Sequence, residues 1–311
     1  MAISTAQDYV NQLQRNIADQ INANFSPSQL LGMVNEARTR VSLDTHGYRT
    51  YLTGLNTISQ VEQYPYSINP ASAPIGGVNV TNGGSGYSAA TEVSIVGGGG
   101  SGAAAYASIS AGVIQNIFMS NWGTGYSSLS PPTIMITDTG GGTGAAATPI
   151  ILSNIIDVMS IDILWGTLRQ VFAYLPFTGF NTYARAYTKL YSIPGVFTLH
   201  QGLQTAFMYP IPDQEYAMSW DIISTTTDLA SLSTPETQLT APWNDAVQWY
   251  ATFLALTSMQ QYEKAKFFYD PQPDGRVGGI YGGRVKQLPA TAFSRRVMNP
   301  YRTYWPMVRK I

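Results

Sequence analysis

Two carboxylates and two histidines are the side chains whose types and spacing could support acid–base chemistry. Asp157 and Asp162 lie five residues apart in a strand-like run, and two carboxylates that flank one bond can hydrolyse a glycoside. Side chains alternate between the faces of a strand, so this spacing places the two on opposite faces. His46 and His200 stand alone, and an isolated histidine is more often structural than catalytic. We therefore expect these residues to have structural roles, and the protein not to be an enzyme.

The stretch GGGTGAAA, residues 140–147, is similar to the phosphate-binding loop of a dinucleotide-binding protein. A similar phrase, GSGAAA, stands at 100–105, and no suitable acidic residue follows about 20 residues later to bind a ribose. A β-turn is therefore the favoured interpretation. The chain has no cysteine, which excludes disulfides and thiolate metal sites. We expect no cofactor and no metal.

A glycine-rich phrase occurs twice, as TNGGSGYS at 81–88 and as SNWGTGYS at 120–127. Each copy leads into a strand-like run and then into a second glycine turn followed by alanines. Such self-similarity predicts two β units of about 40 residues, each with three or four strands. Segment 71–150 is therefore expected to be a small duplicated β module inserted in a larger domain.

Three aromatic residues, Tyr87, Trp122 and Tyr126, stand at these repeated turns. Aromatic rings can bind sugars, so the three are candidates for a surface that binds carbohydrate. The favoured interpretation is that the rings cover glycine backbone and fill a small core. Both interpretations place the rings beside the glycine turns.

Helices are expected at both ends of the remaining sequence. Val10, Leu13 and Ile17 continue at helical spacing to residue 21, and a second helix is expected to begin at residue 27. A single late helix is expected over 243–269. Its residues Trp249, Phe253 and Leu256 lie on more than one face, which predicts burial on several sides and a subunit interface.

Strands are expected between these helices, and the last segment is expected to be irregular. The runs at 48–68, 154–176 and 195–224 are rich in β-branched and aromatic residues, as is typical of strands, and a helix capped by Thr178 is expected at 180–190. Residues 271–311 contain five prolines and the phrase GGIYGGR. These patterns predict an extended C-terminal arm.

Charge is sparse and unevenly distributed. Charged residues make up 11% of the chain and hydrophobic residues 44%, a composition that suits a protein largely covered by copies of itself. Residues 271–311 carry eight basic side chains and one acidic one, whereas the rest carries nine basic and seventeen acidic ones. A basic arm on an acidic body predicts docking to an acidic partner; a protein is favoured, and the phosphates of nucleic acid are the alternative. We see no signal peptide or membrane-spanning run, and expect a chain made in the cytoplasm.

Four stretches resemble the head-to-tail adaptor, or connector, proteins of short-tailed bacteriophages. They are LLGMVNEARTRV, IDILWGTLRQVFAYLPFTGFN, IPDQEYAMSWDII and WNDAVQWYATFLALTSMQQYEKAKFF. The resemblance covers residues 1–69 and 151–270. It implies an α+β fold with a helical adaptor body and antiparallel strands (1–70 and 151–270), a β insertion (71–150) and an extended arm (271–311).

The resemblance also implies a structural virion protein at the head–tail junction, assembled in the host cytoplasm. Copies would form a ring, usually a dodecamer in this family, that binds the portal and a tail or nozzle protein. Viral DNA would pass through the ring without sequence-specific binding. The arm residues that match the portal-docking role are Arg295, Arg296, Arg302, Tyr304, Trp305, Arg309 and Lys310. The alternative is a carbohydrate- or host-surface-binding tail or decoration protein.

Overall fold

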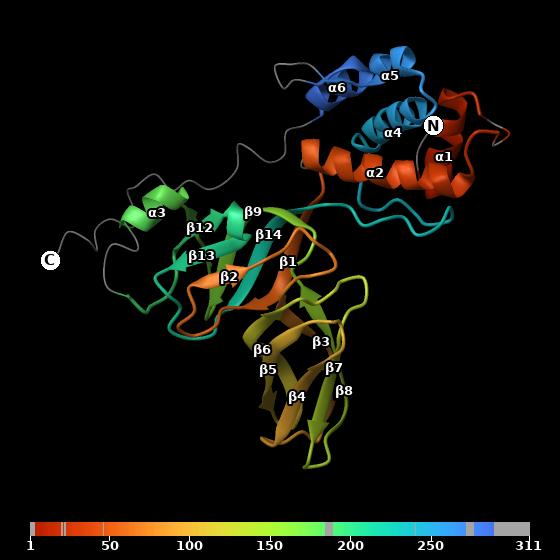
Figure 1. Cartoon of the computed structure of the whole chain (residues 1–311). Helices are drawn as coiled ribbons and strands as arrows, with labels where there is room; N and C mark the ends of the chain where they lie inside the picture. Colours follow the sequence, from red (N-terminus) through yellow and green to blue (C-terminus); the bar gives the residue numbers. More distant parts are fainter. Residues whose placement is uncertain are drawn as a thin grey trace. The chain divides into compact units, whose positions relative to one another are not determined.

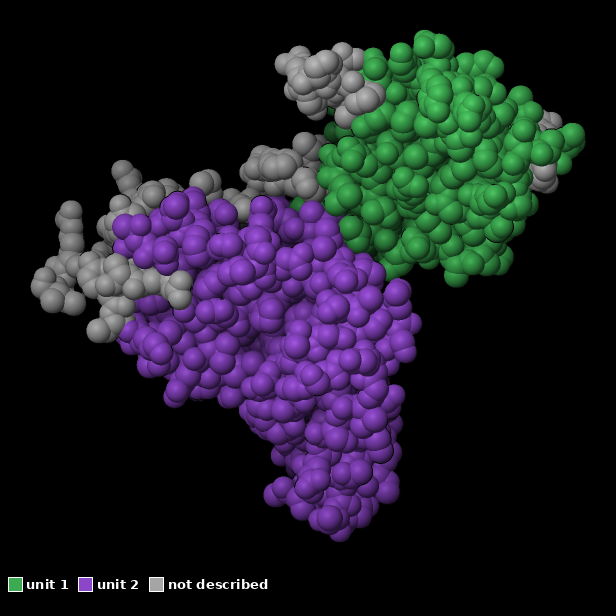
Figure 2. All heavy atoms as spheres, in the orientation of Figure 1, with its two compact units in different colours: residues 1–49, 223–295 green, residues 50–222, 296–311 purple. Residues whose placement is uncertain are grey.

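The structure is a computed structural model of the 311-residue chain. It describes residues 4–19, 21, 23–45, 47–183, 189–239, 241–271 and 277–288. The chain divides into two compact units (Figure 2): unit 1 comprises residues 1–49 and 223–295, and unit 2 comprises residues 50–222 and 296–311. The boundaries that the sequence predicts at 70, 150 and 270 stay predictions.

Unit 1 is helical in its described residues (Figure 1). Its elements are α1 (Ala6–Asn16), α2 (Pro27–Thr45), α4 (Asn244–Ser258), α5 (Tyr262–Phe268) and α6 (Gly279–Gln287), with a short ribbon of β15 (Asp270–Pro271) and β16 (Val277–Gly278). Helix α4 packs against α1, α2, α5 and α6, so it is the central element of the unit. Its buried residues include Val247, Ala251 and Ala255, each fully covered.

Helix α1 begins with a capping box. Thr5 Oγ1 accepts a hydrogen bond from the backbone N–H of Asp8, and the Asp8 carboxylate accepts one from Thr5 N. Hydrogen bonds from Ser4 and Thr5 lower the pKa of Asp8 to about 2. The helix ends at Asn16 and does not continue to residue 21 as expected, because Ala18 adopts a left-handed conformation with φ 58°.

The late helix is also shorter than predicted. Residues 243–269 form two helices, because Gln260 has φ 59° and the Gln261 N–H donates to the carbonyl of Leu256. The prediction of one continuous helix over residues 243–269 is therefore wrong. The segment after residue 271 contains helix α6, where the sequence predicted only irregular chain.

Unit 2 is built from strands. Those outside the duplicated segment are β1 (Arg49–Asn56), β2 (Gln63–Pro65), β9 (Ile155–Trp165), β10 (Leu168–Val171), β11 (Ala173–Tyr174), β12 (Val196–His200), β13 (Thr205–Tyr209) and β14 (Ala217–Ser224). Helix α3 (Phe177–Tyr183) and the 3₁₀ turn η1 (Gln201–Leu203) connect some of them. Those in the duplicated segment are β3 (Ile75–Ser85), β4 (Thr91–Val96), β5 (Ser101–Ser110), β6 (Val113–Thr124), β7 (Thr133–Asp138) and β8 (Thr143–Ile151).

These strands form one large and one small sheet. The ten-stranded sheet has the order β10-β9-β14-β1-β3-β6-β5-β4-β7, with β8 paired to β3, and the four-stranded sheet has the order β11-β12-β13-β2. One continuous core spans both, since Trp122 of β6 contacts Tyr64 of β2 and Trp220 of β14 at ring-centroid distances of 5.0 and 5.9 Å. The duplicated strands therefore share their core with the rest of unit 2.

The two repeats are related by an internal two-fold symmetry that is visible in the strand register. Val78 pairs with Ile117, its equivalent 39 residues later, and Ser94 pairs with Met135, its equivalent 41 residues later. A two-fold axis perpendicular to an antiparallel strand pair exchanges the two strands, so the residues on either side of it are equivalent. The pairs Val78–Ile117 and Ser94–Met135 therefore mark the two points where the axis crosses the sheet. Each repeat therefore contributes three strands, β3–β5 and β6–β8, to the large sheet.

The expected helical adaptor body is wrong. The structure is mostly antiparallel sheet, with 40% strand and 26% helix. Segment 155–224, which the resemblance placed in that body, supplies β9–β14, and β9 and β14 lie in the same sheet as the duplicated strands. The sequence pattern predicted strands in this segment, and the helical body was implied only by the resemblance. How these strands pair depends on contacts between distant segments, which no local pattern specifies.

Candidate interaction surface

The hairpin formed by β9 and β10 exposes more large apolar side chains than a covered strand pair would. Gly166, with φ 59°, and Thr167 connect the strands, and Trp165 pairs with Leu168 directly beside that turn. Further from the turn, Ile161 and Ile163 are fully buried. The end of the hairpin thus projects beyond the core that covers its base.

Four side chains make up this projecting surface, which we call the apolar hairpin. Leu164, Trp165, Leu168 and Val171 are 50%, 49%, 64% and 44% exposed. Because side chains alternate along a strand and paired residues share a face, Trp165 and Leu168 lie on one face and Leu164 and Val171 on the other. Exposed apolar residues gathered on one element are typical of a contact surface.

A polar cluster links the second face of the apolar hairpin to Tyr51 of β1, which lies beyond β14 in the same sheet. The Asp162 carboxylate accepts a hydrogen bond from the Tyr51 hydroxyl at 2.7 Å and pairs with Arg169 Nε at 3.2 Å. The Arg169 guanidinium also lies 5.6 Å from the centre of the Tyr51 ring. Partial burial raises the pKa of Tyr51, and its hydrogen bond to Asp162 raises it further. Asp162 is thus half of an ion pair, and the cluster orders the hairpin.

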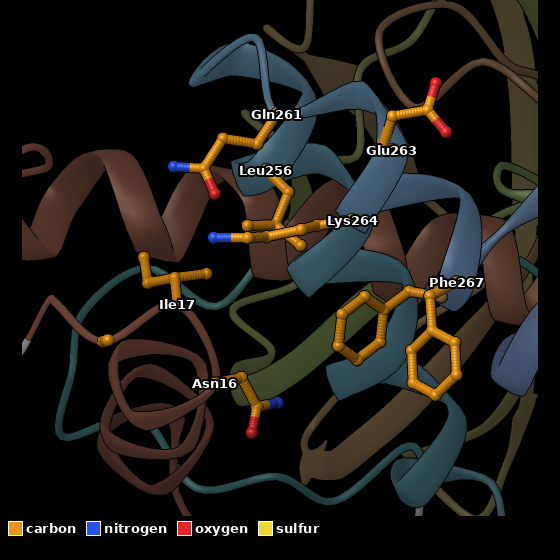
Figure 3. A pocket seen from close by; sticks show the side chains of 9 residues that line it. Asn16, Ile17, Leu256, Gln261, Glu263, Lys264 and Phe267 are labelled. Atoms are coloured by element: carbon orange, nitrogen blue, oxygen red, sulfur yellow. The ribbon is translucent and has the colours of Figure 1, made fainter.

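Unit 1 has an open hollow of about 430 Å³ (Figure 3). Ile17, Leu256, Phe267 and Phe268 are its apolar lining residues, and Glu263 and Lys264 are its charged ones. Phe267 is 65% exposed, whereas Phe268 stacks on Trp249 with ring centroids 6.0 Å apart. The hollow is open to solvent and could receive a side chain of a partner.

The predicted subunit-interface residues pack within unit 1. Leu256 is only 4% exposed, and Phe253 contacts Tyr269 at a ring-centroid distance of 4.7 Å. Trp249 is partly buried against Phe268. These contacts account for the apolar character of α4, and an interface role for the three residues stays a prediction.

The aromatic residues of the repeated turns are buried: Tyr87, Trp122 and Tyr126 are 7%, 3% and 3% exposed. The Tyr87 hydroxyl accepts a hydrogen bond from Ala145 N at 3.1 Å, and the Tyr126 hydroxyl accepts the equivalent one from Ala103 N at 3.3 Å. A Cβ added at Gly142 or Gly100 would meet the corresponding tyrosine ring within 2.6 Å. The tyrosine rings therefore cover glycine backbone, and none of the three residues offers an open platform for a sugar.

The asparagines of the repeated phrase order the turns. Asn82 Oδ1 accepts a hydrogen bond from Gly84 N at 3.0 Å, and Asn121 Oδ1 accepts one from Gly123 N at 2.9 Å. The two glycines have φ values of 61° and 60°. The repeated phrase is thus explained by matching backbone geometry.

Of the two histidines and the arm residues that the sequence singled out, the structure describes only His200. His200 Nδ1 accepts a hydrogen bond from Leu203 N at 3.1 Å, and its ring packs edge-on against Phe177. His46 and the arm residues Arg295, Arg296, Arg302, Tyr304, Trp305, Arg309 and Lys310 lie outside the described residues. Within the described ranges, no group of three or more histidines or acidic residues could hold a metal ion.

No family model matches the sequence, and a search of curated proteins finds no significant match. Among the helices that the structure describes, none combines the length and the apolar character needed to cross a membrane. The sequence predicted strands where β9 and β10 lie, but it did not predict the exposure of their side chains. The run ILWGTLRQV was the available signal, since it places apolar residues on both sides of a Gly-Thr turn.

Proposed function

We propose that this protein is a structural virion component, a head-to-tail adaptor of a short-tailed bacteriophage. Copies of the chain form a ring between the portal and the tail or nozzle protein, and viral DNA passes through it. The observation that carries the proposal is the apolar hairpin. It lies within IDILWGTLRQVFAYLPFTGFN, one of the stretches that resemble the adaptor family.

The exposure of the hairpin supports a role in assembly. Trp165 and Leu168 are 49% and 64% exposed, and fully burying a large apolar side chain against a partner stabilises by about 1.5–3 kcal/mol. A ring buries two different faces of every subunit, about 800 Å² or more per partner. The low proportion of charged residues supports the same role, because covered surfaces carry few charges.

The charge distribution supports the proposed partners. The C-terminal segment 271–311 is strongly basic and the remainder is acidic. A basic segment with interspersed aromatic residues suits a groove of the portal, where Arg, Tyr and Trp contribute most binding energy. An acidic remainder leaves the channel with few cations to hold DNA phosphates.

Electron microscopy of the purified protein mixed with the portal protein of the same virus tests this proposal. We expect rings stacked on the portal. The double substitution Trp165→Ser and Leu168→Ser should prevent ring formation, whereas Leu129→Ser, at a 76% exposed position elsewhere in unit 2, should leave rings intact. The proposal is wrong if the natural chain binds no portal in any oligomeric state, or if both variants assemble equally well.

A further inference from the structure

Strand β10 has one backbone edge with which no strand of the described residues pairs. Phe172 N donates to the Ile161 carbonyl at 2.8 Å, so Phe172 faces β9. Backbone groups point to alternate sides along an antiparallel strand, so Leu168 and Gln170 also face β9, whereas Arg169 and Val171 face away from it. β10 ends the order of the large sheet, and among the described strands none pairs with its outer edge.

The other edge strands of unit 2 are less open to pairing with a further strand. β2 has three residues and ends in Pro65, and β11 has two residues. β7, at the opposite end of the large sheet, lies beside β8. β10 has four residues without proline or register shift, and it exposes one large apolar side chain on each face, Leu168 on one and Val171 on the other. Its outward-facing N–H and C=O groups are a template with which another strand can pair.

We infer that β10 pairs antiparallel with β10 of a second copy, about a two-fold axis through Gln170. In this register Arg169 lies opposite Val171 of the second copy. The two residues exchange both backbone hydrogen bonds, giving about four across the axis. Gln170 then lies opposite Gln170 of the second copy as a non-hydrogen-bonded pair, with Cα atoms about 4.5 Å apart.

The strand is complementary to itself, and this is why the occupant is a second copy. The apolar stem of Arg169 covers Val171 of the second copy, while Asp162 still neutralises its guanidinium. Leu168, 64% exposed, gains Phe172 of the second copy as its opposite residue. A contact limited to one short strand hides less than the roughly 1,200 Å² of a standard interface, so the dimer dissociates on dilution.

This dimer follows from β10 alone and does not depend on the proposed function. It is a state of the free chain, because a two-fold contact is isologous and does not propagate around a ring. The paired strands also cover part of the apolar hairpin. Ring assembly therefore has to separate the dimer first.

A single cysteine tests the register, because the natural chain has none. Under mild oxidation we expect Gln170→Cys to form a disulfide-linked dimer, since the expected Cα separation lies within the range of about 4.4–6.8 Å for a disulfide. Two single-cysteine controls are matched to it. In the dimer, residue 171 lies opposite residue 169 of the second copy. The Cα atoms of the two Val171→Cys residues are therefore two positions apart along the strands, more than about 7 Å, which is too far for a disulfide. Ser110→Cys is exposed on another strand and reports random collision.

Non-reducing electrophoresis should show about tenfold more dimer for Gln170→Cys than for either control, because only that Cα separation permits the bond. Equal cross-linking of Gln170→Cys and Ser110→Cys, or of Gln170→Cys and Val171→Cys, would overturn the inference.

A second variant tests the pairing without cysteine. Val171→Pro removes an N–H that faces away from β9, so the monomer keeps its own ladder while the dimer loses two hydrogen bonds. Sedimentation should show a concentration-dependent dimer for the natural chain and a monomer for Val171→Pro, with cooperative thermal unfolding for both. A natural chain that stays monomeric at every concentration, or a folded Val171→Pro that dimerises as well as the natural chain, would contradict the inference.

Discussion

Arg38 and Glu236 form an ion pair inside unit 1, with 2.7 Å between Nε and Oε2 and with both side chains only 1% exposed. Arg38 Nη1 also donates to the carbonyl of Thr227, and Glu236 Oε1 accepts from the backbone N–H groups of Gln238 and Leu239. The pair therefore joins helix α2 to the long connection between β14 and α4. Breaking it leaves one buried charge without its partner.

Arg38→Met should destabilise the protein by about 3–5 kcal/mol, since Glu236 would remain buried without its cation. Urea unfolding measures this change. Arg40→Met is the matched control, because its pair with Asp44 is partly exposed and should contribute less than about 1 kcal/mol. If the two variants unfold at the same urea concentration, the buried pair contributes no more than an exposed one.

Acid should weaken unit 1 through Glu236. Burial alone would raise the pKa of this carboxyl, but the hydrogen bonds and charge of Arg38 hold it below the ordinary value. Because the folded pKa is depressed, the contribution is complete above about pH 4.3, the unfolded value, and is lost as the pH falls through the folded pKa. Glu236→Gln should be less stable than the natural chain at neutral pH. Urea unfolding across this pH range should show that its free energy of unfolding depends less on pH than that of the natural chain. Glu263→Gln, at a 90% exposed position, should leave the dependence unchanged, and equal slopes for all three would contradict this.

Alanine substitutions at the glycine turns should distinguish two costs to stability: the strain of a positive φ in a residue with a Cβ, and the collision of that Cβ with neighbouring atoms. Gly97→Ala meets no atom within 4 Å and should cost about 1–2 kcal/mol for its positive φ alone. Gly84→Ala and Gly123→Ala have similar strain, and their Cβ atoms would also collide with Thr143 O and Ala103 N. Chemical denaturation should therefore show both to be less stable than Gly97→Ala and, because the repeats are symmetric, similar to each other. A markedly smaller effect at one of the two would show that the repeats are not equivalent there.

Tyr281→Phe should loosen the docking of α6. The Tyr281 hydroxyl is fully buried and donates to Asp44 Oδ2 of α2 at 2.8 Å. Its removal should cost about 1–2 kcal/mol, since Asp44 keeps its contact with Arg40. Hydrogen exchange should become faster in α6 and unchanged in α1. Tyr262→Phe, at a 57% exposed position, is the control and should alter neither helix.

Parts of the fold were predictable because their signals are local. The proline at residue 27 and the periodicity of residues 10–17 predicted where α2 begins and that α1 exists, since capping and periodicity act within a few residues. The repeated phrase predicted a duplication. The break at Gln260 was not predictable, because no glycine or proline marks it.

The candidate surface was only half predictable. The alternation and turn in ILWGTLRQV predicted a strand pair, and the composition predicted that much of the surface is covered by other molecules. Which side chains lie open depends on the position of β10 at the end of a ten-stranded sheet, and that order is set by pairing between segments distant in the chain. For the same reason the sequence could not reveal that Trp122 is buried against Tyr64 and Trp220.

The sequence by itself determined the duplication, the sparse charge, the absence of cysteine and the first turns of the helices, because each is a property of composition or of neighbours along the chain. Only the tertiary structure decided that sheet dominates the fold, that a two-fold axis relates the repeats, and that Trp165 and Leu168 remain exposed. Burial and strand order are properties of contacts between distant segments, and no local pattern specifies which segment will cover another.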